Sequence, residues 1–156
     1  MERKNMLEAF YNAYDEDARL LKNRHGQLEY RTTMQYIRRL LPVGKKLLEV
    51  GAGTGRYSIA LAKEGYDVTA VELVERNLEI LRRNAQGQGQ LTAYQGDASN
   101  LDFLASNSFD AVLLFGPMYH LYTPQEQHKA LDEAIRLAKP GGLVMVAFLS
   151  VYAILY

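Results

Sequence analysis

The chain has 156 residues, which is enough for one domain, since domains commonly comprise about 100–150 residues. Its composition of 48% hydrophobic and 23% charged residues, with no cysteine, excludes a disordered chain, a disulfide-dense scaffold, a thiolate metal site and a cysteine nucleophile. Lys plus Arg equals Asp plus Glu at 18 each, and this balance argues against a nucleic-acid or anionic-membrane partner.

Two helical patterns precede the first predicted strand. They cover residues 6–20 and 27–41, and residues 23–26 are predicted to break them apart. We expect residues 1–45 to form a helical lid or flank on residues 46–156, within one domain overall.

From residue 46 onward, short β-rich segments alternate with helical patterns, which predicts an α/β fold: a mainly parallel sheet with helices on both faces. Helices are predicted over residues 57–64 and 75–84. The predicted strands are residues 47–50, 67–71, 91–94, 109–115 and 143–148.

The last helix has the clearest signals at its start. Thr123 and Glu126 predict a capping box, and Pro124 suits the first helical position. An apolar stripe is expected to pack on the sheet; it consists of Leu131, Ala134, Ile135 and Ala138.

The N-terminal residues contain no apolar core of a signal peptide. The longest apolar stretch, residues 143–156, is shorter than the roughly 20 residues needed to cross a bilayer. We therefore expect no membrane partner and a cytoplasmic location, with which the lack of cysteine is compatible.

A strand that runs into three glycines and then a helix is the most informative segment. Gly51, Gly53 and Gly55 permit positive φ and close approach of a ligand at the carboxyl end of the strand, where open α/β sheets bind ligands. A dinucleotide-binding turn would require Gly or Ala where Arg56 stands, which weakens an NAD interpretation. A glycine-rich connection without a ligand is the alternative.

Two acidic residues follow the next two strands. Glu72 lies 21 residues after Gly51, near the spacing at which an acidic residue accepts hydrogen bonds from a ribose. Asp97 follows the third strand and could accept a hydrogen bond from an adenine amino group. A solvated surface glutamate and a turn-forming aspartate are the alternatives.

Together these segments resemble the class I S-adenosylmethionine-dependent methyltransferases over nearly the whole chain. Residues 49–55 resemble the glycine-rich first motif of that family, and Glu72 and Asp97 stand where its second and third motifs fall. Residues 109–117 resemble the fourth motif, and residues 137–142 resemble the segment that enters the fifth strand. Residues 24–27, 71–75 and 116–121 resemble a bacterial small-molecule-type branch of the family.

The resemblance implies a Rossmann-like sheet of order 3-2-1-4-5, S-adenosylmethionine as the cofactor and methyl transfer to a small-molecule acceptor. Tyr14 and His25 could reach the methionine carboxylate, although a surface loop is the alternative for that region. The cofactor-binding residues implied by the resemblance are Glu49, Gly51, Ala52, Gly53, Gly55, Glu72, Leu73, Asp97, Ala98 and Phe115.

Tyr119 and His120 follow the fourth strand, beside the expected position of the methyl group, and are the candidate catalytic residues. His120 is the better general base, because imidazole titrates nearer neutrality than a phenol. Packing at a loop–helix junction is the alternative for both. His128 is expected on an exposed helix face, and three scattered histidines without cysteine predict no metal site.

The family carries a sixth and a seventh strand after the fifth, whereas this sequence ends at Tyr156. We therefore expect a C-terminally truncated chain whose fifth strand has an apolar edge, able to pair in a homodimer. A module that binds S-adenosylmethionine without transferring methyl is the first alternative function, and an NAD-dependent oxidoreductase is the second.

Overall fold

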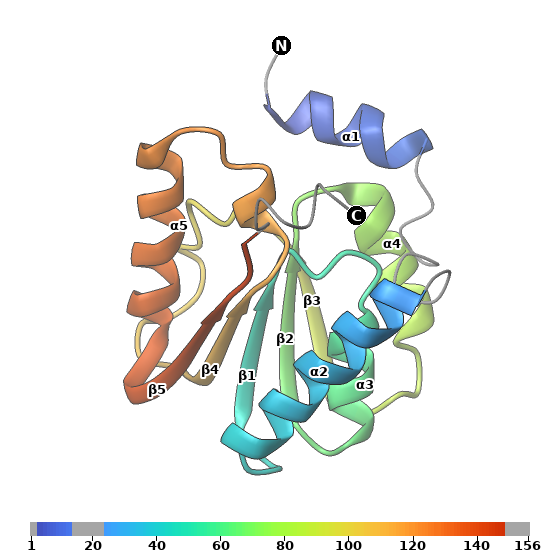
Figure 1. Cartoon of the computed structure of the whole chain (residues 1–156), viewed down its shortest axis with the longest axis vertical. Helices are drawn as coiled ribbons and strands as arrows, with labels where there is room; N and C mark the ends of the chain where they lie inside the picture. Colours follow the sequence, from blue (N-terminus) through green and yellow to red (C-terminus); the bar gives the residue numbers. More distant parts are fainter. Residues whose placement is uncertain (1–2, 14–23, 149–156) are drawn as a thin grey trace.

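A computed structural model describes residues 3–13 and 24–148. Within them, five strands form a parallel sheet of order β3-β2-β1-β4-β5, which confirms the predicted fold class and order (Figure 1). The strands are β1 (Lys46–Val50), β2 (Asp67–Glu72), β3 (Leu91–Gln95), β4 (Phe109–Leu114) and β5 (Ala138–Val146).

The helices are α1 (Arg3–Ala13), α2 (Arg24–Leu40), α3 (Arg56–Lys63), α4 (Glu75–Asn84) and α5 (Pro124–Leu137), with a short 3₁₀ helix, η2 (Pro117–Tyr119). The predicted break over residues 23–26 is wrong for residues 24–26, which form the first turn of α2 with Gly26 buried. Residues 14–20 of the first predicted helix and Asn23 lie outside the described residues. None of the described helices is long and apolar enough to cross a bilayer.

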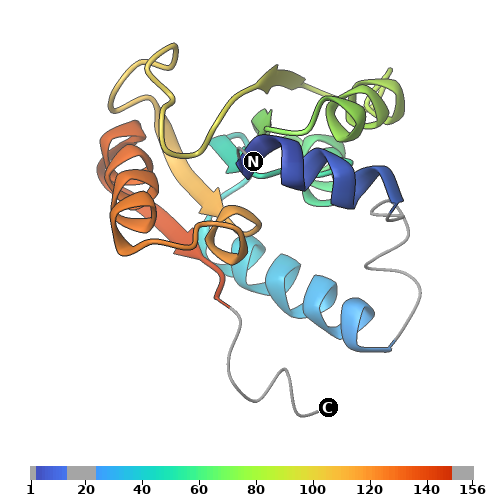
Figure 2. The ribbon, with the colours of Figure 1, turned by 90° about the horizontal axis from the view of Figure 1, so that it is seen from above.

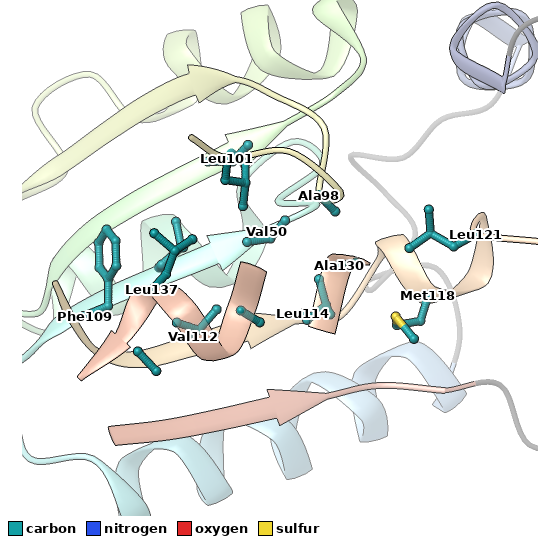
Figure 3. Close-up of a cluster of buried hydrophobic side chains, with 14 residues drawn as sticks. Val50, Ala98, Leu101, Phe109, Val112, Leu114, Met118, Leu121, Ala130 and Leu137 are labelled. Carbon is teal, nitrogen blue, oxygen red and sulfur yellow. The ribbon is translucent and has the colours of Figure 1, made fainter. Parts of the chain in front are cut away.

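The two faces of the sheet bury separate apolar clusters. On one face, Leu47 of β1 belongs to a cluster with Ile37 of α2 and Leu61 of α3, and α2 crosses in front of the sheet in Figure 1. On the other face, Val112 and Leu114 of β4 lie with side chains of α5 (Figure 3). Because successive residues of a strand point to opposite faces, β1 and β4 contribute to both clusters.

The start of α5 follows its sequence signals, and three residues of the predicted stripe, Leu131, Ala134 and Ala138, pack in the cluster on the sheet. The Thr123 hydroxyl accepts from the Glu126 N–H, and the Glu126 carboxylate accepts from the Thr123 N–H, which completes the capping box. The expectation that Ile135 packs on the sheet is wrong, since this side chain is 63% exposed. The buried positions are Ala130, Ala134 and Leu137, at i, i+4 and i+7.

The last strand begins earlier than predicted. β5 starts at Ala138, directly after α5, and its register with β4 shifts between Phe109 and Ala111. The shift accommodates Pro140 and the positive φ of Gly141, which read as strand breakers in the sequence. β5 ends at Val146, before the predicted residue 148.

The carboxylate of Asp110 holds the start of β5 against its neighbours. It accepts from the Lys139 ammonium at 2.9 Å and from the Lys46 N–H at 2.9 Å. The hydrogen bond from Lys139, followed by that from Lys46, lowers the pKa of Asp110.

Arg136 of α5 anchors the segment between β3 and β4. Its guanidinium donates to the carbonyl oxygens of Leu101 at 2.9 Å and Leu104 at 3.0 Å. It also pairs with Glu133, whose carboxylate accepts from the Leu101 N–H at 2.6 Å and whose pKa this pairing lowers. The segment between β3 and β4, which contains no helix, is thus fixed to α5 by these side chains.

Candidate functional site

A cavity of about 400 Å³ opens at the carboxyl ends of the strands. The turns after β1, β2, β3 and β4 form its walls, and α1 contributes Leu7, Phe10 and Tyr11. Figure 2 looks down on α1, which lies over these strand ends. The volume falls within the range of about 300–1,000 Å³ typical of small-molecule sites.

The glycine-rich turn after β1 adopts backbone conformations that favour glycine. Gly51, Gly53 and Gly55 have φ angles of 76°, 57° and 88°. A Cβ on Gly51 would lie 2.5 Å from the Cδ atom of Pro117. The glycine therefore allows the segment after β4 to approach the turn after β1, and both line the cavity together.

Gly55 has a different environment from the other two glycines. It caps α3, and a Cβ at this position would lie 2.7 Å from the Cγ atom of Leu81 in α4. The cavity wall contains Gly51, Ala52 and Gly53 but not Gly55. Close packing of α3 against α4 explains a glycine at this position without a ligand.

Glu72 joins two turns of the wall. Its carboxylate is 6% exposed and accepts from the Gly53 N–H at 2.7 Å and from the Val74 N–H at 2.8 Å. A carboxylate offers about four acceptor positions, so a group of this kind can accept from the hydroxyls of a ligand. Leu73, beside it, also lines the cavity.

Asp97 and Ala98 form the wall after β3. One carboxylate oxygen of Asp97 accepts from both the N–H of Ser99 at 2.9 Å and its hydroxyl at 2.7 Å. This local turn fixes the side chain at the rim of the cavity.

Glu49 lies at the end of β1 and is only 2% exposed. Its carboxylate accepts a hydrogen bond from the Ser58 hydroxyl of α3. Glu49 lines the cavity beside the glycine turn, so it contributes a buried carboxyl group there.

Tyr119 and His120 both line the cavity, and His120 contacts α1. Its Nε2 atom lies 3.0 Å from the Tyr11 hydroxyl, and the two rings are nearly perpendicular with centroids 5.8 Å apart. The carbonyl oxygen of Tyr11 also accepts from Arg76 of α4 at 3.3 Å. These two bonds hold α1 over the cavity.

An aromatic row forms another part of the wall. Tyr57 of α3 stacks on Tyr30 of α2, with ring centroids 5.3 Å apart, and meets Phe115 edge-on at 5.6 Å. The Arg56 guanidinium lies 5.1 Å from the centroid of the Tyr30 ring. Tyr57, Phe115 and Arg56 line the cavity.

Two candidates from the sequence are not part of the described cavity wall. Tyr14 is outside the described residues, and His25 is exposed in the first turn of α2 and absent from the wall. Sequence reasoning missed Tyr11, Glu29 and Tyr57, which reach the cavity from helices whose patterns gave no sign of a ligand. The described residues include no group of three His, Asp or Glu side chains placed to hold a metal ion.

Comparison with known proteins assigns these features to a family. Residues 47–142 match the family model described as a methyltransferase domain. This range extends from β1 into β5 and includes most of the cavity wall.

Two relatives are longer than this chain. It is 36% identical over 142 residues to a demethylmenaquinone methyltransferase of Clavibacter sepedonicus, covering 90% of this chain and 55% of the relative. It is 36% identical over 110 residues to a ubiquinone biosynthesis O-methyltransferase of Idiomarina loihiensis, covering 69% of this chain and 43% of the relative. The chain thus spans about half the length of both.

The PH0226 protein of Pyrococcus horikoshii OT3 has a similar fold. Its crystal structure matches with a TM-score of 0.77 at 21% identity, covering 91% of this chain and 65% of that chain. The similarity includes the strand order that brings the four wall-forming turns together.

Proposed function

Because the chain belongs to the class I S-adenosylmethionine-dependent methyltransferases, we propose that it binds S-adenosylmethionine in the cavity and transfers the methyl group to a small-molecule acceptor. The observation that supports this most directly is the buried carboxylate of Glu72. It lies in the cavity wall, 2.7 Å from the Gly53 N–H, where it joins the glycine turn to the end of β2.

The residues present fit this cofactor. Glu72 would accept hydrogen bonds from the ribose hydroxyls, and Asp97 from the adenine amino group, with the Ala98 backbone beside the base. Gly51 and Gly53 leave room for the methionine part along the turn after β1. The cofactor supplies a methyl group already activated on a positively charged sulfur, so alignment of the acceptor can account for much of the acceleration.

His120 would take the proton of an acceptor hydroxyl. If Nε2–H donates to the Tyr11 hydroxyl, the neutral imidazole leaves Nδ1 unprotonated and able to take that proton. Tyr119 lies in the same wall and would orient the acceptor. Leu7 and Phe10 of α1 would exclude water above the reacting atoms.

The acceptor would be a small ring compound. The aromatic side chains of Tyr57 and Phe115 in the wall favour such a ligand. The names of the two relatives, which refer to demethylmenaquinone and to ubiquinone biosynthesis, support the same class.

Residues 1–45 would act as a lid on the cofactor-binding residues 46–156, and the enzyme would work in the cytoplasm. The side chains of β5 are half-exposed, and an edge of this kind could pair in a homodimer. Cell fractionation tests the location, and sedimentation at several protein concentrations tests the homodimer.

Titration calorimetry and a transfer assay test the main proposal. S-adenosylmethionine and its demethylated product, S-adenosylhomocysteine, should bind, and NAD should not. Transfer of a labelled methyl group to one of a panel of hydroxylated ring compounds would establish activity. Binding without transfer to any acceptor would favour a binding module, and no binding of either ligand would contradict the site.

A further inference from the structure

The cavity wall carries an excess of negative charge. In the part of the wall that the structure describes, the acidic side chains are Glu29, Glu49, Glu72 and Asp97, and Arg56 is the only Lys or Arg. The formal charge of these five groups is therefore −3, in a chain whose net charge is zero. A concave site with one sign of charge concentrates its field on whatever enters.

The single guanidinium of the described wall would already have a partner in the loaded enzyme. The proposed cofactor brings a carboxylate of its own, and Arg56 stands directly after the glycine turn along which its methionine part would lie. A second anion entering as the acceptor would meet no other Lys or Arg in the described wall. It would instead face the carboxylates of the wall, which would repel it.

Aromatic rings in the wall also favour a neutral or positively charged acceptor over an anion. Phe10 and Tyr11 of α1, Tyr57 of α3, Phe115 after β4 and Tyr119 of η2 all line the cavity. The faces of such rings carry partial negative charge, which attracts cations and gives no stabilisation to anions.

Glu29 differs from the other three carboxylates in its position. Glu49, Glu72 and Asp97 follow strands β1, β2 and β3 and accept hydrogen bonds that shape the cofactor half of the wall. Glu29 comes from α2, directly precedes Tyr30 of the aromatic row, is exposed, and lines the cavity. An acceptor bound against the aromatic row would lie on this side of the cavity.

From these observations, and resting on the proposed function, we propose that the cavity selects its acceptor by charge. It takes neutral or positively charged ring compounds and rejects carboxylated or phosphorylated ones, and Glu29 is the residue that sets this preference.

Three catechols of similar shape test the proposal on the full chain, with the cavity loaded with S-adenosylhomocysteine. The probes are 4-methylcatechol, which is neutral, dopamine, which is a cation, and 3,4-dihydroxyphenylacetate, which is an anion. Calorimetric dissociation constants should favour the neutral probe over the anion by about tenfold or more, with the cation bound at least as tightly as the neutral probe. A higher salt concentration should reduce the differences in affinity between the neutral probe and the two charged probes.

Glu29→Gln should reduce the preference for the neutral probe over the anion about threefold or more, while the affinity for S-adenosylhomocysteine changes less than about twofold. Glu79→Gln is the matched control, because Glu79 is exposed on α4 and outside the wall; it should leave the preference unchanged. An anion bound as tightly as the neutral probe, no binding of any catechol, or equal effects of the two variants would overturn the proposal. Failure of S-adenosylhomocysteine itself to bind would instead contradict the proposed function.

Discussion

The hydroxyl of Tyr11 and the Nε2 atom of His120 lie 3.0 Å apart, although the two residues are 109 positions apart in the chain. This bond connects α1, above the cavity, to the segment that follows β4. In the proposed reaction Tyr11 is a positioning residue, since it acts through the imidazole of His120.

Removing either side chain should impair transfer more than cofactor binding. We expect His120→Asn to lower kcat by about 10²- to 10⁴-fold, the usual range for a general base, and Tyr11→Phe by about 3- to 30-fold through loss of one hydrogen bond. The dissociation constant of S-adenosylhomocysteine should stay within about twofold in both. The control is Tyr122→Phe, because Tyr122 is 65% exposed and outside the wall. Equal kcat values for Tyr11→Phe and Tyr122→Phe would exclude the positioning role.

The two acids after β2 and β3 should contribute to cofactor affinity in separable ways. Glu72→Ala and Asp97→Ala should each weaken binding by about 1–3 kcal/mol, or roughly 5- to 150-fold. Asp97→Ala should also reduce the preference for the adenosine cofactor over its inosine analogue, because the inosine base lacks the amino group. Calorimetric titration measures both, and an unchanged preference would refute the contact between Asp97 and the base.

The close approach between Gly51 and Pro117 predicts a stability difference between two glycine substitutions. Gly44 and Gly51 both have positive φ, but a Cβ on Gly44 would meet no atom within 4 Å. Gly44→Ala should therefore lower the free energy of unfolding by about 1 kcal/mol, the cost of the backbone conformation alone. Gly51→Ala should cost about 1–3 kcal/mol more, because the Pro117 ring must move. Urea denaturation measures the difference, and equal costs would show that the contact does not constrain the turn.

Arg136 should stabilise the segment between β3 and β4. Arg136→Ala removes its bonds to Leu101 and Leu104, and we expect a loss of about 2 kcal/mol in the free energy of unfolding. Lys129, exposed on the same helix, provides the control: Lys129→Ala should change it by less than about 0.5 kcal/mol. A similar small change in both variants would contradict the anchoring role.

The ion pair of Asp110 predicts a pH dependence of stability. Because the native state lowers the pKa of this carboxyl, its contribution is fully present above the unfolded-state pKa and is lost as the pH falls through the native pKa. The destabilisation caused by Asp110→Asn should therefore be largest near neutral pH and shrink below about pH 4. Asp132→Asn, at an exposed position of α5, is the control. A pH-independent effect of Asp110→Asn would show that ionisation of Asp110 does not contribute to the stability.

Elements with local signals could be predicted from the sequence, whereas features set by distant contacts could not. The capping box at Thr123 and the three glycines after β1 depend on neighbouring residues, and both are present. The early start of β5 was missed, because pairing with β4 accommodates residues that otherwise terminate strands. Tyr11 was missed for a similar reason, since only the fold brings it to His120.

The cavity wall also has a consequence for synthesis on the ribosome. Every described residue that lines it lies between Leu7 and Leu121, so the described wall is translated before α5 and β5. The apolar face formed by Val112 and Leu114 has no covering helix until Ala130 and Leu137 emerge (Figure 3). A nascent chain would therefore hold these lining groups while still exposing an apolar surface on which chaperones act.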